Sequence, residues 1–466
     1  MSEYCGFVVE VKELRQHTNA DRLQIATIFG NDVCVGLDVA LGNIGIYFPS
    51  DLQLSKEFCE HNNLVRKKDD AGNNIGGYLD PDKRNIRPIR LRGEKSDGIF
   101  IDLFSLAFTG IDINSLSIGD RISIVNGHEI CCKYIPRSNS RPCNSSGNRT
   151  RKTKVPISPL FAEHADTEQL AYNLSAFKPG DEIEITLKMH GTSQRTGYLP
   201  VFKKYKRTLL DFITRKPGKP VYDWGYVSGT RRTVLEDFEG GYYGSNEFRE
   251  QHSKTFEGKL WKGETVYYEV VGFTQTGTPI MGNGNNEKIN DKEFVKQYGK
   301  ETVFSYGCSP TGKKILYGKD EEGHFSIEEN TPQSDMYVYR MTLTTEEGHV
   351  VEYSPDYMCY RCKQMNIKTV PVFEKFYIPN EEELNILGVS AGEYVKEIVN
   401  RYLNTEPDPI GKTHIKEGVV VRIINRPKFT AYKDKVFEFK VIEGLIKSAA
   451  SAPDIEEAED ILDKDN

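Results

Sequence analysis

Hydrophobic and polar positions alternate in short runs along the first 125 residues of the chain, and turn-forming residues separate these runs. The runs are CGFVVEV, LQIATIF, DVCVGL, IGIYFP, GIFIDL and RISIV. Short strands divided by Gly, Asn and Asp are typical of a small antiparallel β-barrel. We therefore predict an OB-like β-barrel over residues 1–130, for which nucleic-acid binding and a purely structural role are both open.

A second group of alternating runs lies within residues 157–450. Ile183, Ile185 and Leu187 alternate with polar residues, as expected of a half-buried strand. Further strand candidates are GETVYYEVVGF, SDMYVYRMTL, EGVVVRII and KVFEFKVI, and a helix is predicted from Asp166 to Leu174. The predicted fold class is α+β, with a larger second domain of antiparallel sheets and helices behind the barrel.

Composition sets the size and the compartment. With 466 residues and a hydrophobic fraction of 38%, the chain can form two or three domains. No apolar run reaches the roughly 18 residues of a membrane span, and the start MSEYCGFVVEV lacks a signal-type apolar block. Nine cysteines without framework spacing fit reduced thiols. We expect a soluble monomer, cytoplasmic or otherwise intracellular, with no membrane partner.

Charge is spread unevenly along the chain, whose net charge is −7. The acidic tail, residues 451–466, carries most of it and is predicted to be disordered. Residues 127–154 hold seven Lys/Arg against one Glu, and residues 203–219 hold seven against one Asp. Such stretches are solvated loops or contacts to a phosphate backbone. We predict a basic linker over residues 131–156.

Lys188 is the first candidate for chemistry. It ends the alternating run and opens a turn rich in glycine and hydroxyl groups, in the stretch TLKMHGTSQRTG. A lysine ammonium, with a reference pKa of ~10.4, must lose its proton before it can act as a nucleophile. Nearby cations and partial burial favour that loss, and a glycine allows close approach to a nucleotide. A lysine at a strand end is also a common surface residue, so the residues that accompany it decide between a nucleophile and an ordinary surface lysine.

Four downstream motifs could supply those partners. They are YYEVVG (267–272), MYVYRM (336–341), KEGVVVR (416–422) and VFEFKVI (436–442). They provide acids that bind a divalent metal and cations that bind phosphate. KMHG resembles motif I, usually KxDG, of the covalent nucleotidyltransferase superfamily of ligases and capping enzymes, and the four others resemble motifs III, IIIa, IV and V. The order of all five over about 250 residues makes the resemblance specific.

The resemblance implies an ATP-grasp-like adenylation domain and a role for each motif residue. Lys188 would attack the α-phosphorus of ATP, release pyrophosphate and carry AMP covalently. Glu269 and Glu417 would bind Mg²⁺ or Mn²⁺ or its waters. Lys440 would contact the α-phosphate and help the nucleophile lose its proton by like-charge repulsion. The other implied nucleotide contacts are Leu187, His190, Gly191, an adenine-stacking Tyr339 or Tyr337, and Arg231 in preference to Arg232.

Departures from the motifs narrow the branch. His190 replaces the aspartate of motif I. A histidine at this position resembles motif I of the T4-type and editing-type RNA ligases. Motif V often has two lysines separated by one residue, whereas Glu438 stands at the earlier place, so Lys433 or Lys435 could substitute. Only 26 residues follow Lys440, too few for the C-terminal OB domain of DNA ligases and capping enzymes. HTNADRLQIATIFG and IGIYFP instead resemble the N-terminal OB-like domain of one RNA ligase branch.

These features together favour an ATP-dependent RNA ligase that joins RNA 3′-OH and 5′-phosphate ends through lysyl-AMP and adenylated RNA, in RNA repair. A DNA ligase, a capping guanylyltransferase and a non-catalytic nucleic-acid-binding protein are the alternatives. Cys359 and Cys362 have the spacing of half a zinc site, yet no second pair follows. His164 and Asp166 could face the nucleotide, although helix capping by Asp166 explains that residue equally simply.

Overall fold

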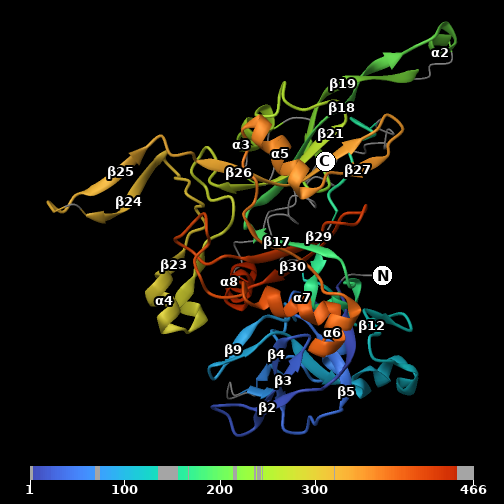
Figure 1. Cartoon of the computed structure of the whole chain (residues 1–466). Coiled ribbons are helices and arrows are strands. Elements are labelled where there is room, and N and C mark those ends of the chain that lie inside the picture. The colour runs from blue at the N-terminus through green and yellow to red at the C-terminus, as the bar shows by residue number, and fades with distance from the viewer. Residues whose placement is uncertain are drawn as a thin grey trace. The chain divides into compact units, whose positions relative to one another are not determined.

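The chain forms two compact units in a computed structural model that describes residues 4–68, 74–134, 156–165, 167–213, 218–235, 238, 243, 245–319 and 321–448 (Figure 1). Both units mix helices with mainly antiparallel sheets. The first unit comprises Met1–Pro136, Asn285–Lys300 and Phe437–Ala449, and the second comprises most of the remainder. Within the described ranges, no helix combines the length and apolarity needed to cross a membrane.

The first unit contains the strands predicted near the start of the chain. A four-stranded sheet has the order β11-β5-β1-β12, from β1 (Gly6–Glu10), β5 (Ile44–Phe48), β11 (Ile99–Asp102) and β12 (Arg121–Ile122). A three-stranded sheet consists of β2 (Leu14–Gln16), β3 (Leu23–Ile28) and β4 (Asn31–Gly36). Two-stranded pairs are β6 (Leu52–Leu54) with β15 (Cys131–Lys133), β7 (Lys67–Lys68) with β8 (Asn74–Gly76), β9 (Ile89–Leu91) with β10 (Glu94–Ser96), and β13 (Ile124–Val125) with β14 (His128–Glu129).

The predicted OB-like barrel is not shown. Among the described residues, the strands of the first unit pair in separate small sheets and do not close into one barrel. Inward residues of the four-stranded sheet, β6 and β15 nevertheless share one core, in which Val8, Ile46 and Phe48 are fully buried. The alternating pattern therefore predicted strands and buried positions correctly, while closure depends on long-range pairing that periodicity does not encode.

Three α-helices complete the first unit: α1 (Lys56–His61), α4 (Lys292–Tyr298) and α8 (Phe437–Ser448). The segment KVFEFKVI was predicted to be a strand, and this prediction is wrong because residues from Phe437 onward form α8. Phe439 and Ile442, three positions apart, are each 1% exposed, as expected for one helix face. Directly before Phe439, Glu438 accepts a hydrogen bond from Arg90 at 2.8 Å and lies 3.1 Å from Lys95 Nζ. These contacts anchor the start of α8 within the first unit.

The second unit contains two larger sheets. The five-stranded sheet has the order β16-β30-β29-β17-β28, from β16 (Glu168–Gln169), β17 (Glu182–Lys188), β28 (Val372–Tyr377), β29 (Gly418–Ile423) and β30 (Thr430–Lys435). The six-stranded sheet has the order β20-β19-β18-β21-β26-β27, from β18 (Thr192–Lys206), β19 (Lys219–Gly229), β20 (Val234–Leu235), β21 (Glu264–Gly272), β26 (Ser334–Thr344) and β27 (Val350–Glu352). A separate hairpin consists of β24 (Lys313–Lys319) and β25 (Phe325–Glu329), and the short strands β22 (Gly284–Asn285) and β23 (Glu301–Thr302) flank α4 in the sequence.

Helices cover these sheets and bury their apolar positions. The helices of the second unit are α2 (Leu209–Ile213), α3 (Glu247–Lys254), α5 (Pro355–Met365), α6 (Glu381–Leu387) and α7 (Ala391–Asn400). Val395 and Val399 of α7 are fully buried in one core with Ile183 and Ile185 of β17, and each such side chain contributes about 2 kcal/mol on burial. A second core joins α3 and α5 to β21 and β26. The ends of β17 and β29 are therefore held on a rigid scaffold.

Local sequence explains where α7 begins. Ser390 lies at the N-cap, where its hydroxyl accepts the Glu393 N–H, and the Glu393 side chain accepts the Ser390 N–H in return. This capping box satisfies two backbone donors that the first helical turn leaves without partners. The predicted helix at 166–174 is wrong over most of its described length, because Glu168 and Gln169 pair with β30 and only a 3₁₀ turn, Leu170–Tyr172, lies wholly within it. Residue 166 lies outside the described residues.

Candidate active site

Lys188 lies where the chain crosses from one sheet of the second unit to the other. β17 ends at Lys188, and β18 of the six-stranded sheet begins only four residues later at Thr192. Register then brings three strand ends together, because Lys188 pairs with Gly418 and Gly418 pairs with Lys435. The predicted strands of motifs I and IV are confirmed, and β30 is a third strand at the same edge.

Glu417 is the centre of this cluster. Its Oε1 lies 2.8 Å from Lys188 Nζ and 3.0 Å from Lys435 Nζ, and its Oε2 lies 3.4 Å from His190 Nδ1. The Glu417 side chain is 2% exposed, whereas that of Lys188 is 22% exposed. A buried carboxylate therefore holds two ammonium groups. Lys188, the nucleophile candidate, is the more accessible of the two lysines, because Lys435 is 12% exposed.

The protonation of Glu417 follows from this arrangement. Burial on its own would raise the pKa of the Glu417 carboxyl, but the charges of Lys188 and then Lys435, together with His190, lower that pKa well below its ordinary value. Glu417 is therefore ionised at neutral pH. An anion of this kind holds cations in place rather than taking up their protons, because its affinity for a proton is too low.

Gly191 allows the crossing segment to lie directly on β21. A Cβ at position 191 would come within 2.4 Å of Val270 O and 2.9 Å of Glu269 Cγ. Any other residue would clash with the backbone of β21, so glycine is required here by close approach. The contact also places the motif I turn against Glu269, the predicted metal-binding glutamate of motif III, which pairs with Ser193 of β18.

A buried aromatic residue that no sequence motif indicated supports the same turn. The His190 N–H donates a hydrogen bond of 2.7 Å to Tyr306 Oη. Burial raises the pKa of Tyr306 well above its usual value, and the negative charges of Asp408, Glu417 and Glu269 add to this effect. Tyr306 is thus a neutral support between the turn and the carboxylates. The His414 ring, whose centroid is 4.8 Å from that of Tyr306, packs behind it.

The two candidate tyrosines for adenine stacking lie in different surroundings. β21 pairs Tyr267 with Arg340 and Tyr268 with Val338, so Tyr339 forms a bulge in β26. The bulge interrupts the alternation that placed Tyr337 and Tyr339 on one face.

Their side-chain contacts differ accordingly. Tyr339 Oη is 2.8 Å from Ser193 Oγ, and its ring lies 5.4 Å from that of His164. Tyr337 donates to Asp335 at 3.3 Å and lies beneath Lys368. Because Ser193 follows the motif I turn closely, Tyr339 is the tyrosine linked to that segment.

Two other predicted nucleotide contacts, Leu187 and Arg231, each make a backbone hydrogen bond. Leu187 is buried, and its N–H donates to Pro371 O at 2.9 Å, so its side chain belongs to the core. Arg231 lies in the turn between β19 and β20, where its carbonyl accepts the His164 N–H at 3.1 Å. Arg231 is partly buried and Arg232 is exposed.

Lys440 differs from the arrangement predicted for it. Instead of ending a strand beside β29, it lies on α8 in the first unit and donates to Asp97 Oδ2 at 2.7 Å. Asp97 is 4% exposed and also accepts a hydrogen bond from Ser50 at 2.6 Å. The lysine that contacts the Glu417 carboxylate together with Lys188 is Lys435, which the sequence offered only as a possible substitute.

Oxygen donors for a metal are limited to few side chains. Glu269 and Glu417 are carboxylates of the type that Mg²⁺ and Mn²⁺ prefer, so the donor set fits such an ion when substrate phosphates and waters complete it. Over the described ranges, no three His, Cys, Asp or Glu side chains gather as a metal site. Cys359 and Cys362 lie on α5, where burial raises the pKa of the Cys362 thiol to about 12.

Comparison with known proteins identifies a similar fold. No protein-family profile matches the sequence, and no curated protein matches it. A structure of a Naegleria gruberi RNA ligase mutant with AMP and Mn has 13% identity and a TM-score of 0.50, with 94% of this chain and 98% of that chain covered. A second mutant of that ligase, with ATP and Mn, has 14% identity and a TM-score of 0.50, with 94% and 97% covered. At such identities the similarity concerns the fold alone.

Proposed function

We propose that this protein is an ATP-dependent RNA ligase that seals 3′-OH and 5′-phosphate RNA ends. The observation that carries the proposal is the convergence of Lys188, Lys435 and His190 on the buried Glu417 carboxylate. This cluster joins the residues of motifs I and IV, and the fold similarity to an RNA ligase agrees with it. The OB-like character of the first unit and a role in RNA repair belong to the same proposal.

In the first step, Lys188 Nζ gives up a proton and attacks the α-phosphorus of ATP. An N–P bond forms, the P–O bond to pyrophosphate breaks, and lysyl-AMP results. Glu417 holds the Lys188 nitrogen at the strand end before reaction, while Lys435 supplies positive charge beside it. That second charge stabilises the developing negative charge on phosphate.

In the second and third steps, AMP passes to the RNA 5′-phosphate, and the RNA 3′-OH then displaces AMP as the strands join. Glu269 and Glu417 would hold the divalent ion, which neutralises phosphate charge in such transfers. Tyr339 would stack on adenine, since it adjoins Ser193 directly after the motif I turn. Arg231 remains the candidate for the ribose or phosphate contact.

We further propose that Lys433 and Lys435 form the motif V pair, in place of Lys440. They are separated by one residue on β30, which pairs with the motif IV strand β29. Lys435 also contacts Glu417 directly, whereas Lys440 donates to Asp97. VFEFKVI resembles motif V in sequence, but its residues from Phe437 onward form helix α8 and not a strand.

Substitution of the two lysines separates these assignments. Lys435→Ala should slow the formation of lysyl-AMP roughly 30-fold, because it removes one preorganised cation from the transition state. Lys440→Ala should leave this rate within about threefold, since its partner is Asp97. Single-turnover labelling with α-labelled ATP measures both rates. The opposite ranking, in variants with parental melting curves, would return the motif V role to Lys440.

The function itself is tested with the full chain, α-labelled ATP or GTP, Mg²⁺ or Mn²⁺, and RNA. We expect covalent label from ATP only, and sealing of RNA that carries a 3′-OH and a 5′-phosphate. DNA strands at the 3′-OH side should seal poorly, which distinguishes an RNA ligase from a DNA ligase. Label from GTP would instead indicate a capping enzyme, and no label from either nucleotide contradicts the whole proposal.

A further inference from the structure

Two strands of the six-stranded sheet continue well beyond it. β18 pairs with β21 only from Thr192 to Gly197, yet it pairs with β19 as far as Lys206. Residues 198–206 and 219–226 therefore form a two-stranded ribbon, here named the β18–β19 arm, with the short helix α2 at its end (Figure 1). An isolated two-stranded ribbon is marginally stable in water, so side-chain packing must support it.

Positive charge accumulates on this arm. Residues 198–206 and 219–226 contain four Lys and one Asp, within a chain whose net charge is −7. Lys203, Lys204, Lys206 and Lys219 are exposed, and over the described ranges none of them has an ion-pair partner. Exposed lysines elsewhere are often compensated, as in the pairs Lys254–Glu250 and Lys313–Glu329. The arm thus carries uncompensated charge suited to a polyanion.

An aromatic row runs along one face of the same arm. Register places Tyr198 opposite Tyr226 and Phe202 opposite Tyr222, and ring centroids 4.8 Å and 6.1 Å apart join the members of each pair. Tyr205 extends the row at 5.0 Å from Phe202 and is 38% exposed. Both faces are partly covered at the base of the arm, because Leu199 packs in a small core on the other face and Tyr198 and Tyr226 pack against the core that contains α3 and α5.

Trp224 completes the row next to Tyr198, at a centroid distance of 5.8 Å. Lys262 Nζ lies 5.1 Å from the centroid of the Trp224 ring, so a cation adjoins the ring. Partly exposed rings beside lysines that lack acidic partners are the combination with which proteins bind single-stranded nucleic acid. Bases stack on the rings, and the cations contact the phosphates.

From this combination we infer that the β18–β19 arm binds a single-stranded segment of the RNA substrate, with phosphates on Lys203, Lys204 and Lys206 and bases on the aromatic row. The inference rests on the proposed ligase function for the identity of the polyanion. RNA is favoured over an acidic protein because a polypeptide carboxylate would use the lysines but not the continuous row of rings. The arm would then extend the RNA contacts beyond the residues that react with ATP.

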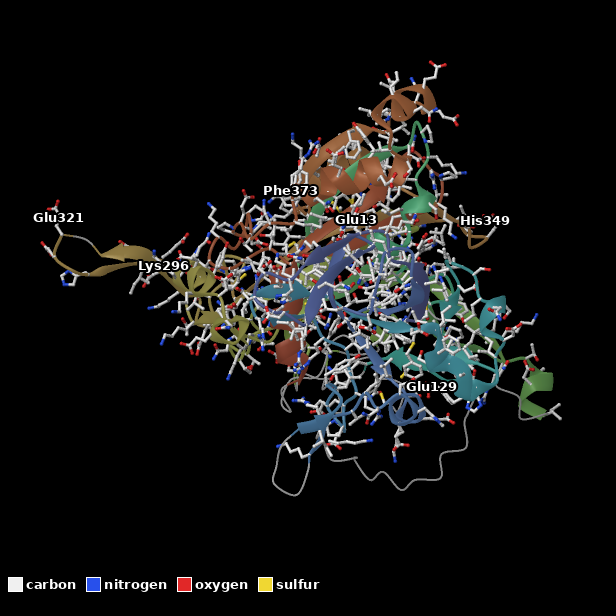
Figure 2. All side chains as sticks on the ribbon, turned by 90° about the horizontal axis from the view of Figure 1, so that it is seen from below. Glu13, Glu129, Lys296, Glu321, His349 and Phe373 are labelled. Atoms are coloured by element: carbon white, nitrogen blue, oxygen red, sulfur yellow. The ribbon has the colours of Figure 1, made fainter. Side chains whose placement is uncertain are left out.

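The test compares three-lysine variants of the full chain. Lys203→Ala/Lys204→Ala/Lys206→Ala removes charge from the arm, and Lys254→Ala/Lys300→Ala/Lys313→Ala removes the same charge elsewhere. Lys313 belongs to the β24–β25 hairpin, whose turn is marked by Glu321 in Figure 2. Fluorescence anisotropy with a labelled 12-nucleotide single-stranded RNA, without ATP, gives the Kd at several salt concentrations.

The arm variant should bind this RNA at least tenfold more weakly at low salt. The slope of log affinity against log salt should become shallower by about 2, since each phosphate contact on a single strand contributes about 0.7. The matched control should keep the parental slope. Tyr205→Ala should weaken binding about tenfold through lost stacking, whereas Tyr205→Phe, which keeps the ring, should restore it.

Two outcomes would overturn the inference. One is a parental RNA affinity and salt slope in the arm variant. The other is an arm variant that binds RNA as the parent does but no longer binds polyglutamate, a model acidic polypeptide; this result would assign the arm to an acidic protein. Labelling of Lys188 by ATP needs no RNA and should stay parental in the arm variants. If the parent chain is never labelled but loses RNA binding through the arm, the ligase proposal fails while the RNA site stands.

Discussion

Lys188→Ala is expected to abolish covalent labelling by α-labelled ATP, a loss of more than about 10⁴-fold. The substitution removes, from the end of β17, the nitrogen that would form the phosphoramidate. Lys435 makes this experiment demanding, because its Nζ contacts the same carboxylate oxygen, Glu417 Oε1, at 3.0 Å. A second amine therefore lies beside the proposed nucleophile.

Peptide mapping of the labelled parent chain decides between the two amines. The adduct should lie on the peptide that contains Lys188, and none should lie on the peptide that contains Lys435. Lys178→Ala is the matched control, since Lys178 is an exposed lysine shortly before the same strand. Residual adduct on Lys435 in the Lys188→Ala protein, at a rate near that of the parent, would contradict the assignment.

The sequence predicted the part of the candidate site that lies on strands with a clear pattern of apolar residues. The period of two through Ile183, Ile185 and Leu187 correctly predicted β17, which ends at Lys188. The apolar run after Glu417 likewise predicted β29. Their pairing was not encoded in either run, yet two neighbouring strand ends were enough to bring Lys188 and Glu417 together.

Lys440 shows where periodicity loses its power to discriminate. The segment FEFKVI alternates as a strand would, but Phe439 and Ile442 also have the spacing of a helix face, and short apolar runs fit both patterns. In the structure, the start of the helix is held by Arg90 and Lys95, which pair with Glu438 from more than 340 positions away in the sequence. The Lys433–Lys435 spacing was visible in the sequence, whereas its register with Gly418 was not.

Tyr306 could not have been found from any local pattern. It lies 116 positions after His190, whose N–H it accepts, and no motif includes it. Its partner His414 is equally remote from the turn. Supports of this kind come from segments that connect the motifs, so a motif-based prediction names candidate reacting groups and misses the residues that position them.

Glu417→Gln is expected to slow lysyl-AMP formation about 10³-fold while keeping the size of the side chain. The neutral amide would leave Lys188 and Lys435 beside each other without the anion that now lies 2.8 Å and 3.0 Å from them. It would also remove a carboxylate that the proposed metal needs. Glu184→Gln is the matched control, because Glu184 is also a buried glutamate paired with a lysine, Lys375, on the same sheet.

Stability measurements separate the charge of Glu417 from its chemistry. Loss of one partner from a buried ion pair costs about 3 kcal/mol, so Glu417→Gln should lower the free energy of unfolding at pH 7. The pKa of Glu417 is lowered in the folded state, so its stabilising contribution is complete above the unfolded value of about 4.3 and is lost as the pH falls further. Urea unfolding should therefore show the gap between parent and variant narrowing below pH 4.3. A gap that stays constant with pH would mean that the Glu417 charge does not stabilise the fold, and the 10³-fold rate loss would then have to come from metal or substrate contacts alone.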